Sequence, residues 1–106
     1  MKNLRIPYSY TCFSCGADLA FHNNIIATNF VSKNRKAFLF SHVRNIIEGP
    51  KMERMLITGI HKICDIKCSS CDSEVGWKYD EAFIESQKYK EGKFVLIRSL
   101  ISKEFL

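Results

Sequence analysis

The chain has 106 residues, of which 46% are hydrophobic and 25% are charged. This length supports a single domain over residues 1–106, and this composition argues against a disordered chain or a membrane protein, whose spanning helices need roughly 20 apolar residues in a row. The formal net charge of +5 lies in residues 1–47, where six basic residues accompany the single acid Asp18, while the remainder has ten of each sign.

The first half of the chain reads as a series of short β-strands. Residues 6–12 are rich in tyrosine and predict a first strand, and residues 25–31 predict a second. A polar, basic loop is expected at 32–36, followed by a third strand at 37–44 that ends before Gly49-Pro50.

The second half continues the same pattern. Thr58-Gly59 predicts a hairpin between strands at 52–57 and 60–67. The sequence predicts further strands at 74–79 and 93–101, while residues 81–86 fit either one helical turn or a loop. We therefore expect a mainly β domain of antiparallel strands.

Two Cys-x-x-Cys pairs, Cys12/Cys15 and Cys68/Cys71, carry the clearest chemistry. A tight turn brings two sulfurs of such a pair onto one tetrahedral ion, and backbone amides in the turn stabilise the thiolates. Gly16 suits the left-handed backbone needed after the first pair, and Asp72 tolerates it after the second.

The alternatives for these cysteines are four ordinary buried thiols or a redox motif. A thioredoxin-like site uses one pair at the start of a helix, whereas both pairs here are flanked by β-type sequence. The pairs are 52 residues apart, so one ion would join two distant parts of the chain. We expect one structural zinc ion bound by Cys12, Cys15, Cys68 and Cys71, because four thiolates leave no open position for catalysis.

The fifth cysteine, Cys64, lies in a strand-like segment and is expected to be a core thiol. A nucleophilic pair with His61 is excluded by geometry, because residues three apart in a strand point to opposite faces. The sequence also contains no Ser-His-Asp order, no paired carboxylates and no open metal site. We therefore expect the protein not to be an enzyme.

The basic bias predicts a docking surface formed by Lys33, Arg35, Lys36 and Arg44. Lysine and arginine neutralise phosphates, and neighbouring aromatic side chains stack on bases. The favoured hypothesis is a binding module that docks on a ribonucleoprotein or ribosome through its basic N-terminal half. The alternative for these residues is an ordinary solvated surface.

The sequence resembles the Yippee-like proteins over residues 8–97. The resemblance rests on six segments, which are Tyr10–Cys15, Ala37–Phe40, Arg54–His61, Asp65–Cys71, Gly76–Tyr79 and Ser86–Phe94. It implies the β-tent fold shared with the thalidomide-binding domain of cereblon, in which two antiparallel sheets pack at a steep angle with zinc at the apex. The 52-residue gap is also typical of the family.

The chain departs from the family pattern at three places. Residues 32–36 replace a Gly-Arg-x-Gly-Arg stretch, Arg98 stands where an acid is usual, and the histidine usual near Asp18 is absent. Yippee-like proteins look like non-enzymatic zinc modules of the nucleus, cytosol and centrosome. One branch of the family associates with a multi-subunit ubiquitin ligase. The resemblance therefore implies a cytoplasmic or nuclear protein and, as the alternative function, an adaptor subunit of such a ligase.

Trp77 matches a tryptophan that lines an aromatic cage in cereblon-like domains. Such a cage holds a cyclic imide or a cation against aromatic faces, and its other walls here would be Tyr79, Phe38 and Phe40. The alternative is a tryptophan that only packs against one sheet.

Overall fold

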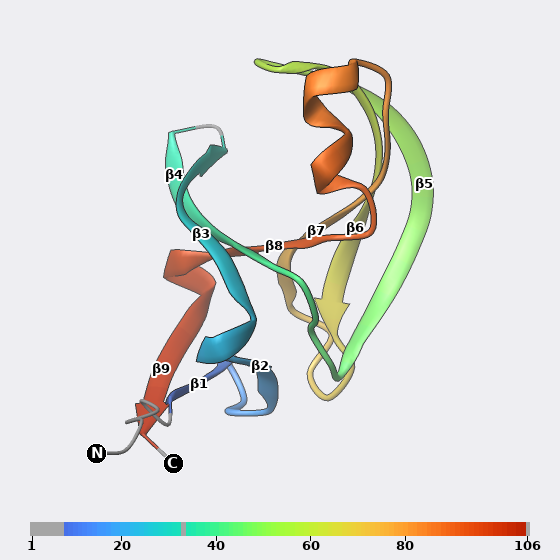
Figure 1. Ribbon diagram of the computed structural model, residues 1–106. Coiled ribbons are helices and arrows are strands. Elements are labelled where there is room, and N and C mark those ends of the chain that lie inside the picture. The colour runs from blue at the N-terminus through green and yellow to red at the C-terminus, as the bar shows by residue number, and fades with distance from the viewer. Residues whose placement is uncertain (1–7, 33, 106) are drawn as a thin grey trace, which may run out of the picture.

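The computed structural model describes residues 8–32 and 34–105, and its strands form two antiparallel sheets (Figure 1). The smaller sheet has the order β2-β1-β9, and the larger has the order β3-β4-β8-β7-β6-β5. The strands are β1 (Tyr8–Cys12), β2 (Asp18–Phe21), β3 (Ile25–Ser32), β4 (Arg35–Phe40), β5 (Ile46–Leu56), β6 (Gly59–Cys68), β7 (Glu74–Ala82), β8 (Phe94–Ile97) and β9 (Ile101–Phe105). The prediction of a mainly β fold with two antiparallel sheets is confirmed.

Among the described residues, three short 3₁₀ helices connect these strands: η1 (His22–Asn24), η2 (Glu85–Lys90) and η3 (Arg98–Leu100). The undecided segment at 81–86 is split between the end of β7 and the start of η2. In the described part of the chain, no helix has the length and apolar character required to cross a membrane.

The prediction of one final strand at 93–101 is wrong, because the structure divides this segment between the two sheets. β8 pairs with β4 and β7 in the larger sheet, whereas β9 pairs with β1 in the smaller one. The three residues of η3 redirect the chain from one sheet to the other. Local sequence pattern does not reveal this change of partner.

Other parts of the chain also differ from the predictions. β2 was not predicted, and residues 41–44 are not in a strand. Of the predicted basic loop, Ser32 belongs to β3 and Arg35 and Lys36 to β4, while residue 33 lies outside the described residues. Gly49-Pro50 does not interrupt β5, because β5 is an edge strand and its register against β6 shifts between Glu48 and Lys51.

The hairpin between β5 and β6 is confirmed, with its turn one residue earlier than expected. Leu56 pairs with Gly59, so the two-residue loop is Ile57-Thr58. The sequence placed the turn at Thr58-Gly59 because glycine favours the positive φ that Gly59 adopts, +115°.

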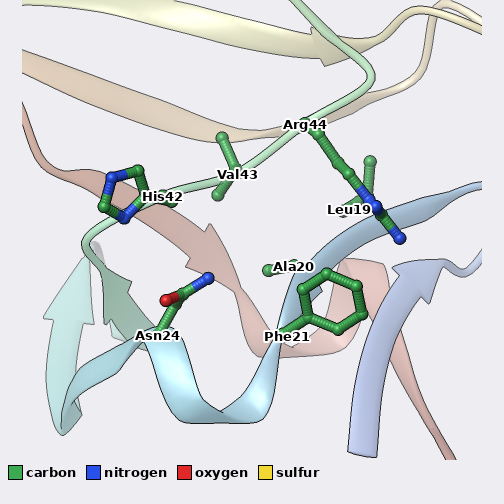
Figure 2. A pocket seen from close by; sticks show the side chains of 7 residues that line it. All are labelled: Leu19, Ala20, Phe21, Asn24, His42, Val43 and Arg44. Atoms are coloured by element: carbon green, nitrogen blue, oxygen red, sulfur yellow. The ribbon is translucent and has the colours of Figure 1, made fainter. Parts of the chain in front are cut away.

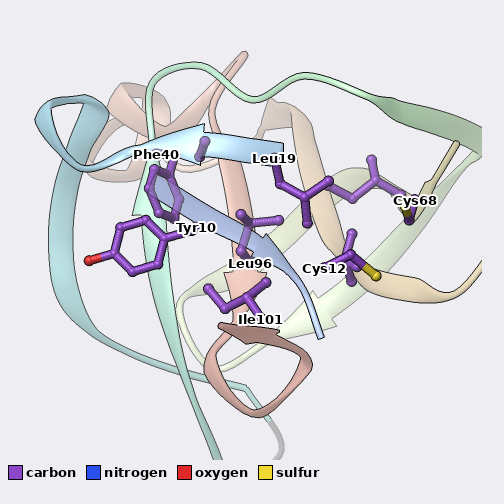
Figure 3. Packing of buried hydrophobic residues seen from close by; sticks show 10 residues of the cluster. Tyr10, Cys12, Leu19, Phe40, Cys68, Leu96 and Ile101 are labelled. Atoms are coloured by element: carbon purple, nitrogen blue, oxygen red, sulfur yellow. The ribbon is translucent and has the colours of Figure 1, made fainter. Parts of the chain in front are cut away.

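One hydrophobic cluster joins the two sheets (Figure 3). Tyr10 and Cys12 of β1 and Leu19 of β2 pack there against side chains of the larger sheet. Phe40, Leu96 and the other central members of this cluster are almost completely inaccessible to solvent. A second cluster, which includes Leu39, Tyr79 and Val95, covers the opposite face of the larger sheet.

Gly76 allows β7 and β8 to lie unusually close together. A Cβ atom at this position would collide with the backbone carbonyl of Val95. The contact is with backbone, so no side-chain rearrangement can relieve it. The glycine in the Gly76-Trp77 pair is thus required by the pairing of these strands.

Candidate metal centre

The two cysteine turns are built from the same hydrogen bonds. In the first turn, the amide of Cys12 donates to the carbonyl of Ala17 at 2.9 Å, and the amide of Gly16 donates to the carbonyl of Cys12 at 2.8 Å. In the second turn, the amide of Cys68 donates to the carbonyl of Ser73 at 2.8 Å, and the amide of Asp72 donates to Cys68 at 2.8 Å. Two segments far apart in sequence therefore fold into matching turns.

The residue after each pair has the predicted left-handed backbone. Gly16 has a φ of +83° and Asp72 has a φ of +64°. This conformation costs glycine nothing and costs an aspartate little, whereas a β-branched residue would be strained.

Each turn is also anchored to a neighbouring segment. The amide of Phe13 donates to the carbonyl of Leu100 at 3.1 Å, and the amide of Ser69 donates to the carbonyl of Asn45 at 2.8 Å. The first turn is thus attached to η3 and the second to the segment before β5. Both turns have fixed positions relative to their own sheets.

The fold brings the sulfurs of Cys12, Cys15, Cys68 and Cys71 together, all within 4.8 Å of one another. The Sγ atoms of Cys12 and Cys71 are 3.6 Å apart, and those of Cys15 and Cys68 are 3.5 Å apart. A tetrahedral ion with bonds of about 2.3 Å to sulfur places its ligands about 3.8 Å apart. The four sulfurs are therefore positioned to hold a metal ion of that size.

Backbone and hydroxyl groups favour the ionised form of at least one sulfur. The Ser73 hydroxyl, 3.2 Å from Cys71 Sγ, and the Ser73 amide lower the pKa of Cys71 to about 6. The Ala17 amide acts on Cys15 in the same sense, but burial and the neighbouring thiols outweigh it and raise the pKa of Cys15 to about 12. Thiols this close together resist joint ionisation unless a cation compensates their charge, and metal binding then releases protons.

The comparison with known families agrees with this geometry. Residues 8–104 match the family described as "Yippee-Mis18: Yippee zinc-binding/DNA-binding /Mis18, centromere assembly". The chain belongs to the Yippee-Mis18 family. It is 46% identical over 98 residues to a yippee-like protein of Arabidopsis thaliana, covering 92% of each chain.

Relatives from animals have a similar level of sequence identity. The chain is 44% identical over 100 residues to the human protein yippee-like 4, which covers 94% of this chain and 79% of the human protein. Among solved structures, the crystal structure of the Mis18 "Yippee-like" domain superposes with a TM-score of 0.73 at 13% identity, covering 94% of this chain and 97% of that domain. The latter similarity shows that the fold is shared.

The structure does not bring the predicted basic residues of this Yippee-like chain into one patch. Lys33 lies outside the described residues. Arg35 and Lys36 open β4, while Arg44 follows its far end, and six strand residues span about 20 Å. Arg35 faces a groove and Lys36, its neighbour in the strand, faces the opposite side.

Arg44 instead belongs to a small pocket beside the smaller sheet (Figure 2). Its guanidinium group lies 4.4 Å from the centre of the Phe21 ring and 3.4 Å from the carboxylate of Asp18. At about 160 Å³ the pocket is smaller than ordinary ligand sites of about 300–1,000 Å³. Arg44 is thus partly neutralised and separate from Arg35 and Lys36.

A different group of basic and aromatic residues lies at the edge of the contact between the two sheets, on the face of β4 opposite the groove that Arg35 faces. The Arg98 guanidinium is 5.9 Å from the ring of Phe38, and the Lys103 ammonium is 4.6 Å from the ring of Tyr8. Lys36 lies two residues before Phe38 on β4 and so shares its face. We call Lys36, Arg98 and Lys103 with these two rings the outer basic face. The sequence reasoning missed Arg98 and Lys103 because they come from a region with balanced charge.

The aromatic pocket is only partly as predicted. Trp77 and Tyr79 line a groove of about 750 Å³ between the β3–β4 and β5–β6 hairpins. Phe38 and Phe40 do not line it, because their rings pack against Tyr10 on the opposite face of β4. We call this space the concave groove. Its other aromatic walls are Phe30 and Tyr89.

Cys64 is buried in β6, as expected of a core thiol. Its sulfur lies 3.9 Å from Glu48, and burial raises the pKa of the Cys64 thiol. The His61 ring instead packs against Tyr79 at 5.2 Å on the other face of β6. The prediction that these two side chains point to opposite faces is confirmed.

The β5–β6 hairpin exposes a group of apolar side chains that the sequence reasoning also missed. Ile57 at its turn is 99% exposed and Met55 is 73% exposed. We call these two residues, together with the exposed Ile60, Phe83 and Ile84, the apolar tip. A group of neighbouring exposed apolar residues on a small domain is typical of a contact surface for another protein.

Proposed function

We propose that this Yippee-like chain is a non-enzymatic binding module that is held in its fold by one structural zinc ion and docks on a ribonucleoprotein such as the ribosome. The observation that carries the docking proposal is the outer basic face, where cationic groups lie directly over aromatic rings. We further propose that the protein acts in the cytoplasm, the nucleus or both, where such assemblies occur.

The donor set supports zinc and a structural role for it. Cys12, Cys15, Cys68 and Cys71 supply four sulfurs at tetrahedral spacing, and thiolates are preferred ligands of zinc. When bound, the ion would link the β1–β2 turn of the smaller sheet to the β6–β7 turn of the larger one. A site filled by four protein ligands leaves no position for a substrate, which supports a non-enzymatic protein.

The outer basic face has the chemistry that RNA backbones and unstacked bases require. Lysine and arginine neutralise phosphates, and the partly exposed rings of Tyr8 and Phe38 offer aromatic edges and faces to bases. Lys36 and Arg98 have no carboxylate partner among residues 8–32 and 34–105, so their charges are available. Each phosphate contact makes affinity fall with added salt.

The proposal is tested by binding the zinc-loaded chain to ribosomes and to structured RNA over a range of salt concentrations. Binding is expected to weaken steeply as salt rises. The triple variant Lys36→Gln, Arg98→Gln, Lys103→Gln should reduce the magnitude of the negative slope of log K against log[salt] by about 2–3. The matched control changes Lys51, Lys62 and Lys67, which form ion pairs on the larger sheet, to glutamine. Affinity that is insensitive to salt, or equally reduced by both triple variants, would contradict the proposal.

The apolar tip favours a second candidate function, an adaptor that contacts only proteins, such as a subunit of a multi-subunit ubiquitin ligase. Ile57→Asp should then remove co-purifying ligase subunits that persist after nuclease treatment, while Ile47→Asp, a half-exposed residue at the other end of β5, should leave them bound. Loss of every co-purifying protein on nuclease treatment would exclude the adaptor and favour the ribonucleoprotein.

A further inference from the structure

The concave groove contains an ammonium group that nothing in the described chain neutralises. Lys90 at the end of η2 is only 4% exposed, and its Nζ makes one hydrogen bond, to Thr58 Oγ1 at 3.2 Å. Across residues 8–32 and 34–105, no carboxylate forms an ion pair with it. Burial lowers the pKa of Lys90. A buried charge without a counterion is costly to the fold, so its presence calls for an explanation.

Aromatic rings surround this ammonium group on three sides. Its Nζ lies 5.2 Å from the centre of the Phe30 ring, 5.3 Å from Tyr79 and 5.9 Å from Tyr89. The chain's own lysine therefore occupies the place that a cationic ligand would take in an aromatic cage. A second cation would be repelled, which argues against cations as ligands of the groove.

Other buried polar atoms in or beside the groove also lack partners. They are Trp77 Nε1, Gln87 Oε1 and, behind Tyr79, His61 Nε2. In the described residues only one further buried side-chain atom, Ser9 Oγ, is in this state. Buried polar groups are normally hydrogen-bonded, so a cluster of unsatisfied ones suggests a ligand that completes them.

The charges along the groove change sign from one end to the other. Arg35, Arg54 and Lys90 line it together with Asp65 and Glu74. Arg54 pairs in register with His61, while Asp65 lies four residues further along β6, about 13 Å away. The hairpin end is therefore basic, and the end nearer the cysteine turns is acidic.

We propose that the concave groove binds a nucleoside phosphate, with its phosphate at Lys90 and Arg54, its base against Trp77 or Tyr89, and its hydroxyl or amino donors toward Asp65. The volume of about 750 Å³ lies in the usual range for ligand sites. Phosphate accepts charge-assisted hydrogen bonds from lysine and arginine, and a flat base stacks on aromatic side chains. This site is separate from the outer basic face, so its failure would leave the proposed docking function standing.

The test uses the fluorescence of Trp77, the one tryptophan of the chain, in the zinc-loaded protein. AMP and UMP are titrated beside adenosine, uridine and inorganic phosphate, with isothermal calorimetry as a second readout. The nucleotides should bind and change the fluorescence, and the matching nucleosides should bind roughly ten- to hundredfold more weakly because they lack the charge-assisted contacts. A short RNA with a 5′ phosphate, compared with the free nucleotides, shows whether the source is a nucleotide or the end of an RNA.

Two variants and a control locate the contact. Lys90→Met keeps the length of the side chain and should weaken nucleotide binding roughly ten- to hundredfold without lowering the melting temperature. Arg54→Met serves as a second, partly exposed variant and should weaken binding in the same direction. Lys62→Met, on the opposite face of β6, should leave binding unchanged.

Three results would overturn the proposal. They are the absence of nucleotide binding at millimolar concentration, equal affinities for nucleotide and nucleoside, and unchanged affinity in both Lys90→Met and Arg54→Met. If Lys90→Met alone unfolds the protein, the role of Lys90 is structural, and Arg54→Met with the nucleoside comparison then decides whether the phosphate site exists.

Discussion

The cysteine turns and the concave groove differ in how completely their polar groups are satisfied. In the turns, the amides of Cys12 and Cys68 each have a carbonyl partner and the four sulfurs face one another. In the groove, Lys90 has one hydrogen bond, and the indole N–H of Trp77 has none. In the turns the backbone groups are satisfied and only the four sulfurs await an ion, which would serve the fold. In the groove the unsatisfied groups are an ammonium and buried polar side-chain atoms, which are available to an organic ligand.

The two sites also differ in what their loss should cost. The turns come together where the two sheets share one buried cluster, so we expect an ion bound there to stabilise the whole fold. The groove lies on the other face of the larger sheet, where side chains can change without separating the sheets. Removal of the metal site should therefore abolish the fold, whereas changes in the groove should affect binding far more than stability.

The largest effect is expected from Cys68→Ser. Zinc contributes about 10–16 kcal/mol in small zinc peptides, and a domain of this size has a net stability of roughly 5–15 kcal/mol. The variant should lose zinc and unfold, as measured by metal content and circular dichroism. Cys64→Ala is the matched control, because Cys64 is a buried non-ligand. It should keep one zinc ion and lose only about 1–2 kcal/mol.

A smaller loss is expected from Gly76→Ala, which lies between the two sites. The new methyl group would meet the Val95 carbonyl and force β7 and β8 apart, at a cost of about 1–3 kcal/mol. Chemical denaturation measures this loss. A variant as stable as the parent would show that the two strands do not approach as closely as the structure places them.

The matching turns allow a paired experiment on backbone conformation. Gly16→Ala should cost about 1 kcal/mol because its φ is positive, although nothing lies within 4 Å of the new Cβ. Asp72→Gly should be neutral or slightly stabilising, because glycine adopts the same φ without strain. Melting temperatures at saturating zinc measure both, and the same sign for the two changes would contradict the equivalence of the turns.

The smallest change in stability is expected from Lys90→Met. Loss of the Thr58 hydrogen bond and of contacts with three rings is offset by removal of a buried ammonium group. The free energy of unfolding should stay the same or rise by up to about 1 kcal/mol. A clear loss of stability by denaturant titration would mean that Lys90 is a structural residue.

The sequence predicted the metal turns because each depends on neighbours in the chain. Cys12 and Cys15 lie close together in sequence whatever the fold of the rest of the chain. Gly16 indicates the left-handed backbone conformation of the turn. That the two cysteine pairs meet was inferred from the four ligands that one zinc ion requires. The two-sheet arrangement was inferred from the family resemblance. The change of sheet at η3 was missed because nothing in residues 93–101 shows which strand each half will pair with.

The groove could not be predicted from the sequence for the same reason. The groups that meet there come from β3 (Phe30), the β5–β6 turn (Thr58) and η2 (Lys90), and only the tertiary fold brings them together. Phe38 and Phe40 alternate with Ala37 and Leu39 along β4, so the two pairs point to opposite faces of the sheet. The sequence does not show which of these faces lines the groove, and the prediction chose the wrong one for Phe38. The basic residues were grouped by charge along the chain, whereas Arg98 joins Lys36 only through the pairing of β8 with β4.

The most direct test of the metal account is thermal unfolding followed by circular dichroism, with and without a strong zinc chelator under reducing conditions. We predict that the chelator abolishes the cooperative β-sheet transition and that added zinc restores it, with one zinc ion bound per chain. A metal-free protein that keeps the same spectrum and melting temperature would contradict the account.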